Sequence, residues 1–236
     1  MKRALLVHGL SSGPDGWWRV RGWLEGAGWT TASVALRGHG GLPPAQSYHV
    51  MSYASDLAAS GPWDLVIAHS LGGAAATIVA ADDPAWTSRL ILLDPVWRIP
   101  DDEMQGVIDD QRSDLDYTRE SLITAKPHWD PRDIDAKLAA IAQVDPDAVV
   151  RTWTDTGTWD LTDAARALAV PTLVLGGDPA VYTMLEPADG HAIAEANPHI
   201  QYRIVPGSAH SPHRDVPDVT RGLILGWLGL DRKDAP

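Results

Sequence analysis

Cysteine is absent from the 236 residues of this chain, and so is phenylalanine. Without cysteine the chain can form no disulfide, no thiolate metal site and no cysteine nucleophile, and the absence fits a reducing compartment. Basic residues are also scarce, because 19 Lys and Arg stand against 31 Asp and Glu, for a formal net charge of −12. Since nucleic acids and anionic membranes attract basic surfaces, this balance disfavours both as partners.

Long apolar runs are missing as well. The apolar start at residues 4–7 leads straight into His8 and Gly9, and is too short for the core of a signal peptide. No stretch approaches the ~20 apolar residues that a membrane-spanning helix needs. We therefore expect a cytoplasmic protein. Its length suits a single α/β domain with an insertion, and its 44% hydrophobic and 21% charged residues are ordinary for a globular chain.

Short apolar runs alternate with segments of helical spacing. The expected buried strands are residues 4–7, 32–36, 65–68, 90–93, 172–175 and 201–205. The expected helices between and after them are residues 17–26, 53–59, 71–81, 187–196 and 217–228. Uniformly apolar strands alternating with helices are typical of a parallel sheet covered on both faces. The sequence thus predicts an α/β fold with a mainly parallel sheet.

Residues 96–169 interrupt this alternation. Four charged, helix-like segments follow one another there without a convincing strand, at residues 101–112, 118–125, 134–142 and 147–154. A stretch of this length inside a compact domain is usually a lid or carries its own structure. We predict a helical cap at residues 96–169, inserted into a core of residues 1–95 and 170–236. The chain has eleven tryptophans, and we expect three in the cap, Trp97, Trp129 and Trp153, to line an aromatic pocket.

Ser70 is the strongest candidate for a reactive side chain. An apolar run ends at residues 68–73, Ala-His-Ser-Leu-Gly-Gly, and a small-residue helix follows at once. This is the layout of a nucleophile elbow, in which a strained turn exposes the serine hydroxyl at the carboxyl edge of a sheet. Small neighbours such as Gly72 are needed because helix and strand approach closely. Ala68 departs from the usual G-x-S-x-G pattern, and the alternative is that Ser70 only caps the helix.

A second strand runs into a glycine-rich loop at residues 8–16. This loop would bring backbone N–H groups to the same edge of the sheet as Ser70. Acyl transfer needs two such donors aimed at the developing oxyanion, and we expect them at Leu10 and Leu71. Ser11 is a further candidate for contact with the substrate, and His8 is expected to be structural. The alternative is a plain turn whose glycines serve geometry alone.

Nine histidines compete for the role of general base. His210 is preferred because it lies in a loop between the last predicted strand and the last helix, from which an imidazole can reach over the sheet edge. His213 is the rival, although its neighbours are typical of a helix start. His69 flanks the nucleophile but is expected to point away from it. We retain it as a candidate pocket residue, together with His39 in another edge loop.

The third member of the site should be a carboxylate that holds the imidazole of His210. Asp178 follows a buried strand and a Gly-Gly turn, and Asp94 follows the preceding strand in the same way. Asp178 is preferred, since it gives the order Ser, Asp, His that accompanies a nucleophile elbow. For Asp94, which precedes a proline, a role in stabilising the turn is the alternative.

Four motifs in order, at residues 7–10, 37–40, 68–73 and 207–210, carry a family resemblance. The chain resembles the α/β-hydrolase superfamily, in particular its small single-domain members with a helical cap, over residues 2–95 and 170–230. The resemblance implies a mainly parallel sheet, a mechanism without metal or cofactor, and a substrate pocket between core and cap. The chain begins at the third strand of the superfamily's sheet, so about six strands are expected.

The ordered residues predict hydrolysis of a small, apolar carboxylic ester or lactone through an acyl-enzyme. Signalling or mycotoxin lactones, amides and carbon–carbon bonds are alternative substrates for the same residues. A hydrolase-like receptor for a small molecule, or a structural module with a relict site, are alternatives of other classes. The sequence predicts no oligomeric state.

Overall fold

The computed structural model describes residues 2–230, so Met1 and residues 231–236 of the predicted core lie outside it. Its central sheet has six strands, all parallel, in the order β2-β1-β3-β4-β7-β8. The strands are β1 (Arg3–Val7), β2 (Thr30–Val34), β3 (Leu65–His69), β4 (Leu90–Leu93), β7 (Thr172–Gly176) and β8 (Ile200–Ile204). The predicted α/β fold with a parallel sheet of about six strands is confirmed.

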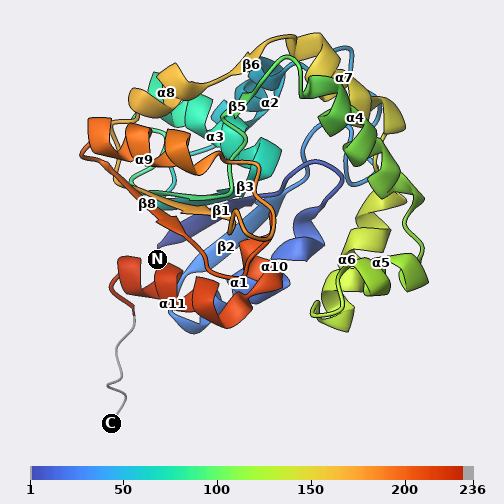
Figure 1. Ribbon diagram of the computed structural model, residues 1–236. Coiled ribbons are helices and arrows are strands. Elements are labelled where there is room, and N and C mark those ends of the chain that lie inside the picture. The colour runs from blue at the N-terminus through green and yellow to red at the C-terminus, as the bar shows by residue number, and fades with distance from the viewer. Residues whose placement is uncertain (1, 231–236) are drawn as a thin grey trace.

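Helices cover both faces of this sheet (Figure 1). One face carries α1 (Trp18–Gly26) and α11 (Pro217–Trp227). The other carries α2 (Val50–Ala58), α3 (Ser70–Asp82) and α9 (Pro187–Ala196). These are the five helices predicted for the core, with ends shifted by up to three residues. No helix within residues 2–230 is long and apolar enough to cross a bilayer.

The four central strands, β1, β3, β4 and β7, are mainly apolar because both faces of the sheet are buried there, whereas the edge strands β2 and β8 carry polar, partly exposed residues. In β1, Leu5 and Val7 pack in the layer of α2, α3 and α9, whereas Ala4 and Leu6 pack in the layer of α1 and α11. Successive side chains of a strand point to opposite faces, so each layer receives every second residue. A strand covered on both sides therefore has no polar face to show in its sequence.

The inserted helices follow β4. They are α4 (Met104–Ser113), the 3-10 helix η2 (Asp114–Asp116), α5 (Arg119–Ala125), α6 (Pro131–Ile141) and α7 (Pro146–Thr156). We refer to α4–α7 as the insertion, and in Figure 1 it lies beside and above the sheet. Two strands not predicted from the sequence, β5 (Arg98–Ile99) and β6 (Trp159–Asp160), pair antiparallel at its base. Strands of two residues are too short to leave a periodic pattern.

Besides η2, three short helices were missed by the sequence pattern. They are the 3-10 helix η1 (Pro14–Trp17), α8 (Thr162–Arg166) and α10 (Pro212–Asp215). Of these, α8 packs on α3 and α9. The end of the predicted cap, residues 162–166, thus belongs to the helical layer over the sheet. The bounds 96–169 remain a prediction about domain division.

The parallel arrangement brings the carboxyl ends of all six strands to one edge. In the register of the sheet Val7 pairs with Ala68, and His69 pairs with Leu93. The loops after β1, β3, β4, β7 and β8 therefore leave the sheet side by side. Ligands of open α/β sheets bind at this edge.

Helix α3 passes very close to the end of β1. A Cβ on Gly72 would lie 2.4 Å from the carbonyl oxygen of His8 and 2.8 Å from that of Val7. Both atoms are backbone atoms beside a buried strand, so they cannot move aside cheaply. This is the close approach of helix and strand that the small residues after Ser70 predict.

We expect Gly72→Ala to lower the free energy of unfolding by about 1–3 kcal/mol, the usual effect of overpacking. Gly106→Ala is the matched control, because Gly106 lies in α4 with open space where its Cβ would be. It should raise that free energy by about 0.5–1 kcal/mol through helix propensity. Urea unfolding measures both, and similar effects of the two substitutions would contradict the close packing at Gly72.

Candidate active site

Ser70 lies at the start of α3, directly after β3. Its φ is +54°, in the left-handed region that side chains other than glycine rarely adopt. The N-cap of α3 is His69, and the helix has no side-chain cap, so Ser70 does not serve as the capping residue. The loop after β1 abuts it, since a Cβ on Gly9 would stand 3.2 Å from the Ser70 Oγ. This is the geometry of a strained elbow at the sheet edge.

Two backbone donors flank Ser70. The N–H of Leu71 belongs to the first turn of α3, where N–H groups have no partner within the helix. The N–H of Leu10, which follows Gly9, donates to no group of the described chain. Both lie where the sequence predicts an oxyanion hole, one on the nucleophile's own helix and one on the adjoining loop.

Two buried histidines fix the loop that carries Leu10. His8 Nδ1 donates to the carbonyl of Gly9 (2.8 Å), and its Nε2 accepts the N–H of Leu36 (3.1 Å). His39 Nε2 accepts the N–H of Ser11 (3.2 Å), and its Nδ1 donates to a carbonyl two residues earlier (2.9 Å). Burial lowers the pKa of His8 to about 3 and that of His39 to about 4. Both rings are therefore neutral and structural.

Ser11 is held rigidly by these contacts and by the insertion. Its φ is +51°, its side chain is fully buried, and its carbonyl accepts a hydrogen bond from Lys137 Nζ of α6 at 3.2 Å. The hydroxyl of Ser11 is buried without a partner. The predicted contact of Ser11 with substrate remains a prediction.

His210 lies in the loop after β8, and its Nδ1 is 2.6 Å from Oδ2 of Asp94. Asp94 is completely buried at the end of β4. Its carboxylate also accepts hydrogen bonds from Gly177 N (3.1 Å), Thr183 Oγ1 (2.6 Å) and Met184 N (2.8 Å). An imidazole whose Nδ1–H is held by a buried carboxylate presents Nε2 as its free, basic nitrogen.

The predicted pairing of Asp178 with His210 is wrong. Asp178 is half-buried, and its carboxylate accepts the backbone N–H groups of Gly207 (2.8 Å) and Ala180 (2.9 Å). These two hydrogen bonds, that of Gly207 first, lower the pKa of Asp178. Asp178 stabilises the turns after β7 and β8. Stabilising a turn is the alternative role that the sequence analysis gives to Asp94.

The order of the strands explains why Asp94 takes this position. Because His69 pairs with Leu93, the next residues, Ser70 and Asp94, leave their strands at the same level. The histidine loop starts from β8, at the edge of the sheet, and β7 and β4 lie between it and β3. On its way to the nucleophile the loop therefore passes the end of β4, where Asp94 stands.

His69 and His213 lie against His210 and are both buried. The His69 ring is 4.7 Å from that of His210 and 5.2 Å from that of His213, which is stacked on Trp17 at 4.7 Å. Burial holds the pKa of both rings well below the ordinary value. His213, the rival base, is thus fixed in the interior. His69 packs between loops, and its contact with a substrate stays a prediction.

The three tryptophans expected in a pocket are buried in packing. Trp97 donates its indole N–H to a threonine of α3 (3.0 Å), and Trp153 packs on a neighbouring tryptophan ring at 4.7 Å. Trp129 donates to the carboxylate of Asp215 in α10 at 2.7 Å. None of the three lines the cavity beside the site, and their contact with a substrate stays a prediction.

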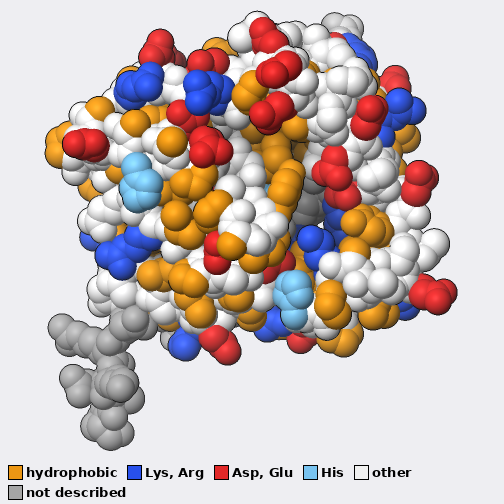
Figure 2. Space-filling view, in the orientation of Figure 1, with side chains coloured by type: hydrophobic (Ala, Val, Ile, Leu, Met, Phe, Trp, Pro, Cys, Tyr) orange, Lys and Arg blue, Asp and Glu red, His pale blue; other side chains and the backbone are white. Residues whose placement is uncertain are grey.

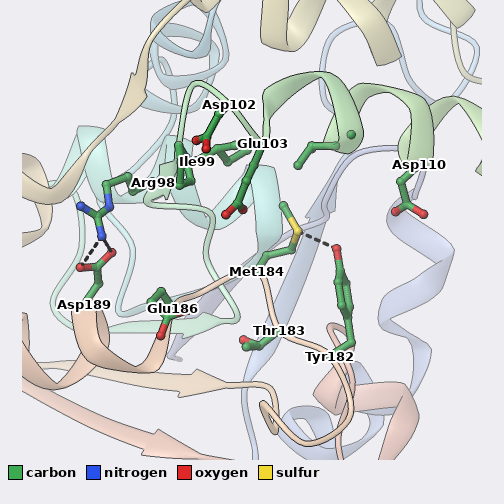
Figure 3. A pocket seen from close by; sticks show the side chains of 13 residues that line it. Arg98, Ile99, Asp102, Glu103, Asp110, Tyr182, Thr183, Met184, Glu186 and Asp189 are labelled. Carbon is green, nitrogen blue, oxygen red and sulfur yellow. Dashed lines mark hydrogen bonds and ion pairs between the residues drawn. The ribbon is translucent and has the colours of Figure 1, made fainter.

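A cavity of about 510 Å³ opens beside the site, between α4 and residues 182–186 (Figure 3). The ring of Tyr182, in its wall, is 6.3 Å from that of His210. Thr183 and Met184, also in the wall, are the residues that bond Asp94. Five carboxylates line it, those of Asp102, Glu103, Asp110, Glu186 and Asp189. Figure 2 shows acidic side chains over the α4 side of this face and a hollow beside the insertion.

A family comparison agrees with this geometry. The model of the alpha/beta hydrolase family matches residues 4–222. The chain belongs to the alpha/beta hydrolase family. The four motifs that carry the resemblance in the sequence all lie within the matched residues.

Individual relatives of this hydrolase include a lipase and an esterase. Lipase LipV of Mycobacterium tuberculosis is 32% identical over 152 residues, which cover 61% of this chain and 53% of the lipase, about half its length. An esterase from Exiguobacterium antarcticum superposes with a TM-score of 0.81 at 17% identity, covering 97% of this chain and 92% of the esterase. The crystal structure of E-2-(acetamidomethylene)succinate hydrolase superposes with a TM-score of 0.81 at 20% identity, covering 97% of this chain and 91% of that hydrolase. These two structures share the fold.

Asp94→Asn and Asp178→Asn separate the two candidate acids. Asp94→Asn should lower kcat of the hydrolase by about 10³–10⁴-fold, because an amide no longer stabilises the imidazolium or fixes its tautomer. Asp178→Asn should leave kcat within about twofold, since its carboxylate contacts only turn amides. Steady-state kinetics with an activated ester measures both, and an equal loss in the two variants would refute the assignment of Asp94.

The buried histidines predict an acid-labile fold. An unfolded histidine takes up a proton below about pH 6.5, whereas folded His39 resists protonation down to about pH 4. The stability it contributes is therefore present above pH 6.5 and is lost as pH falls toward 4, by about 1.4 kcal/mol per pH unit. In His39→Gln the free energy of unfolding, measured with urea between pH 6 and 4.5, should fall less steeply with pH, by that amount per pH unit. An unchanged slope would contradict a neutral His39.

Proposed function

We propose that this hydrolase cleaves carboxylic esters, lactones included, through an acyl-enzyme on Ser70. One observation carries the proposal: the buried carboxylate of Asp94 holds Nδ1 of His210 at 2.6 Å, and the His210 ring lies 4.7 Å from that of His69, the residue before Ser70, whose φ is +54°. Serine, histidine and carboxylate in this relation are the parts of a nucleophilic triad. The lipase and esterase among its relatives support the same class of reaction.

In the proposed mechanism, Nε2 of His210 accepts the proton of Ser70 Oγ as that oxygen attacks the ester carbonyl. The tetrahedral intermediate collapses when His210 returns the proton to the leaving alcohol, and the acyl group stays on Ser70. Water, deprotonated by His210, then attacks the acyl-enzyme and releases the acid. Asp94 stabilises the imidazolium that forms in both steps.

The N–H groups of Leu10 and Leu71 supply the oxyanion hole in this mechanism. Both donors are rigid: Leu71 belongs to α3, and the loop of Leu10 is fixed by His8 and His39. Donors that are already oriented cost no reorganisation when charge develops on the oxygen. A preorganised pair of this kind is worth several kcal/mol in the transition state.

The cavity next to Tyr182 is the proposed place for one side of the substrate. Its five carboxylates outnumber the one cation in the wall, Arg98, which pairs with Asp189, so the negative charge disfavours substrates that carry a free carboxylate. A cavity of about 510 Å³ accommodates a small molecule. Since the predicted tryptophans do not line it, we propose small, uncharged esters as substrates, in place of the small apolar ones that the sequence predicts.

Ser70→Ala tests the proposal directly. It should lower kcat on p-nitrophenyl acetate by at least about 10³-fold and abolish labelling by a fluorophosphonate probe, because both need the hydroxyl. Ser60→Ala is the matched control: Ser60 lies between α2 and the start of β3, at the opposite edge of the sheet from Ser70, and bonds only Leu57 and tryptophan groups. Parental turnover by the Ser70→Ala protein would refute the acyl-enzyme.

A substrate panel distinguishes the alternatives once turnover depends on Ser70. Short esters, long esters, homoserine lactones, macrocyclic lactones and anilides separate esterase, lactonase and amidase activities. We expect the highest kcat/KM for short uncharged esters. A single burst of acylation without turnover would instead indicate a receptor, and no labelling of Ser70 would indicate a relict site.

A further inference from the structure

His69 makes a hydrogen bond that the proposed mechanism does not use. Its Nε2 lies 2.8 Å from the backbone carbonyl oxygen of His210. A carbonyl can only accept, so the His69 nitrogen carries the proton and donates it. The residue next to the nucleophile is therefore bonded directly to the main chain of the residue that serves as the base.

We propose that His69 is a positioning residue, which holds the backbone of His210 in place relative to Ser70 by donating to the His210 carbonyl. The inference rests on the proposed function, in which His210 is the base for Ser70. His69 does not touch the reacting atoms in this role, because its donor nitrogen is already engaged. It acts through the loop that carries the base.

The surroundings of His69 make it a rigid anchor. It is the last residue of β3, and it pairs with Leu93 in the middle of the sheet. Its Nδ1 side faces the loop after β1, since a Cβ on Gly9 would lie 2.9 Å from that nitrogen. The ring of His213 packs on it edge-on at 5.2 Å. A side chain enclosed in this way has no other rotamer available.

The histidine loop needs such an anchor because it crosses the sheet edge. His210 follows the edge strand β8, which is separated from β3 by β4 and β7. The bond from Nδ1 to Asp94 fixes one end of the side chain. The main chain of the loop is held on either side of His210, by the Asp178 N–H on the Ser208 carbonyl (2.8 Å) and by the Ser211 N–H on the carboxylate of Asp215 (3.0 Å). The bond from His69 holds the carbonyl between these points, and with the Asp94 bond it orients Nε2 of His210.

Donation by a neutral ring suits this position. A lysine or arginine would also donate, but its charge would oppose the positive charge that His210 gains from Ser70. The charged and titratable groups facing His69 are His210, His213 and Arg214, and burial together with these groups keeps its pKa well below the ordinary value. His69 therefore donates at all pH values at which His210 can act as a base.

The test compares variants that keep or remove the donor. In His69→Gln the amide nitrogen replaces Nε2, and in His69→Met a side chain of similar size has no donor. We expect His69→Gln to keep kcat on p-nitrophenyl acetate within about threefold, and His69→Met to lose about 10–100-fold, the cost of a small misplacement. KM should stay within about twofold in both, since substrate binding is not affected.

Thr77→Val is the control for stability. It removes buried hydrogen bonds to Gly73 and Trp97 in the same helix as Ser70, without a contact to His210. It should lower the melting temperature and leave kcat unchanged. If His69→Met does not fold, His69→Asn takes its place, because its amide is too short to reach the carbonyl. Full kcat without the donor would overturn the proposal, and so would equal losses in the Gln and Met variants.

A second readout does not depend on substrate. The Nδ1 proton of His210, shared with Asp94 over 2.6 Å, should give a strongly downfield proton NMR signal. We expect this signal to persist in His69→Gln and to broaden or vanish in His69→Met. Persistence in both variants would overturn the positioning role. A wild-type protein without esterase activity would refute the proposed function, while this signal would still decide the placement of His210.

Discussion

The buried carboxylate of Asp94 is the interaction on which the site depends. It joins three segments that are distant in sequence: the end of β4, the loop after β7 through Gly177 and Thr183, and the histidine loop through His210. A fully buried charge is tolerated only where donors surround it, and here backbone amides, a hydroxyl and an imidazole do so. The same hydrogen bonds that make the charge tolerable therefore build the site.

Backbone strain is concentrated around that carboxylate. Three residues other than glycine have φ in the left-handed region within residues 2–230, and they are Ser11, Ser70 and Asp94. Each stands one or a few residues beyond the end of a strand, on the same edge of the sheet. Conformations of this kind cost about 1–3 kcal/mol each, and they persist where the surroundings determine them completely. The firm packing of α3 on β1 at Gly72 provides such surroundings for Ser70.

The fold and the candidate site differ in how far local sequence determines them. Apolar runs and helical spacing report burial directly, so six strands and nine helices were predicted close to their observed bounds. The elbow at Ser70 and the loop of His210 are also local features. The choice between Asp94 and Asp178 is not, because both follow a buried strand. It depends on the order of strands in the sheet, which places β4 beside β3 and leaves Asp178 in an exposed turn.

The lining of the cavity beside His210 could be predicted from the sequence even less well than the choice between Asp94 and Asp178. Tryptophans in the insertion suggested an aromatic pocket, but an indole with a buried N–H needs an acceptor, and those of Trp97 and Trp129 find theirs in the core. The cavity is walled instead by α4 and residues 182–186, which carry no motif. Thr183 and Met184 both line this cavity and donate hydrogen bonds to Asp94. A molecule bound against them would therefore contact the residues that hold the Asp94 carboxylate. One short segment therefore forms part of the cavity wall and also supports the carboxylate that holds His210.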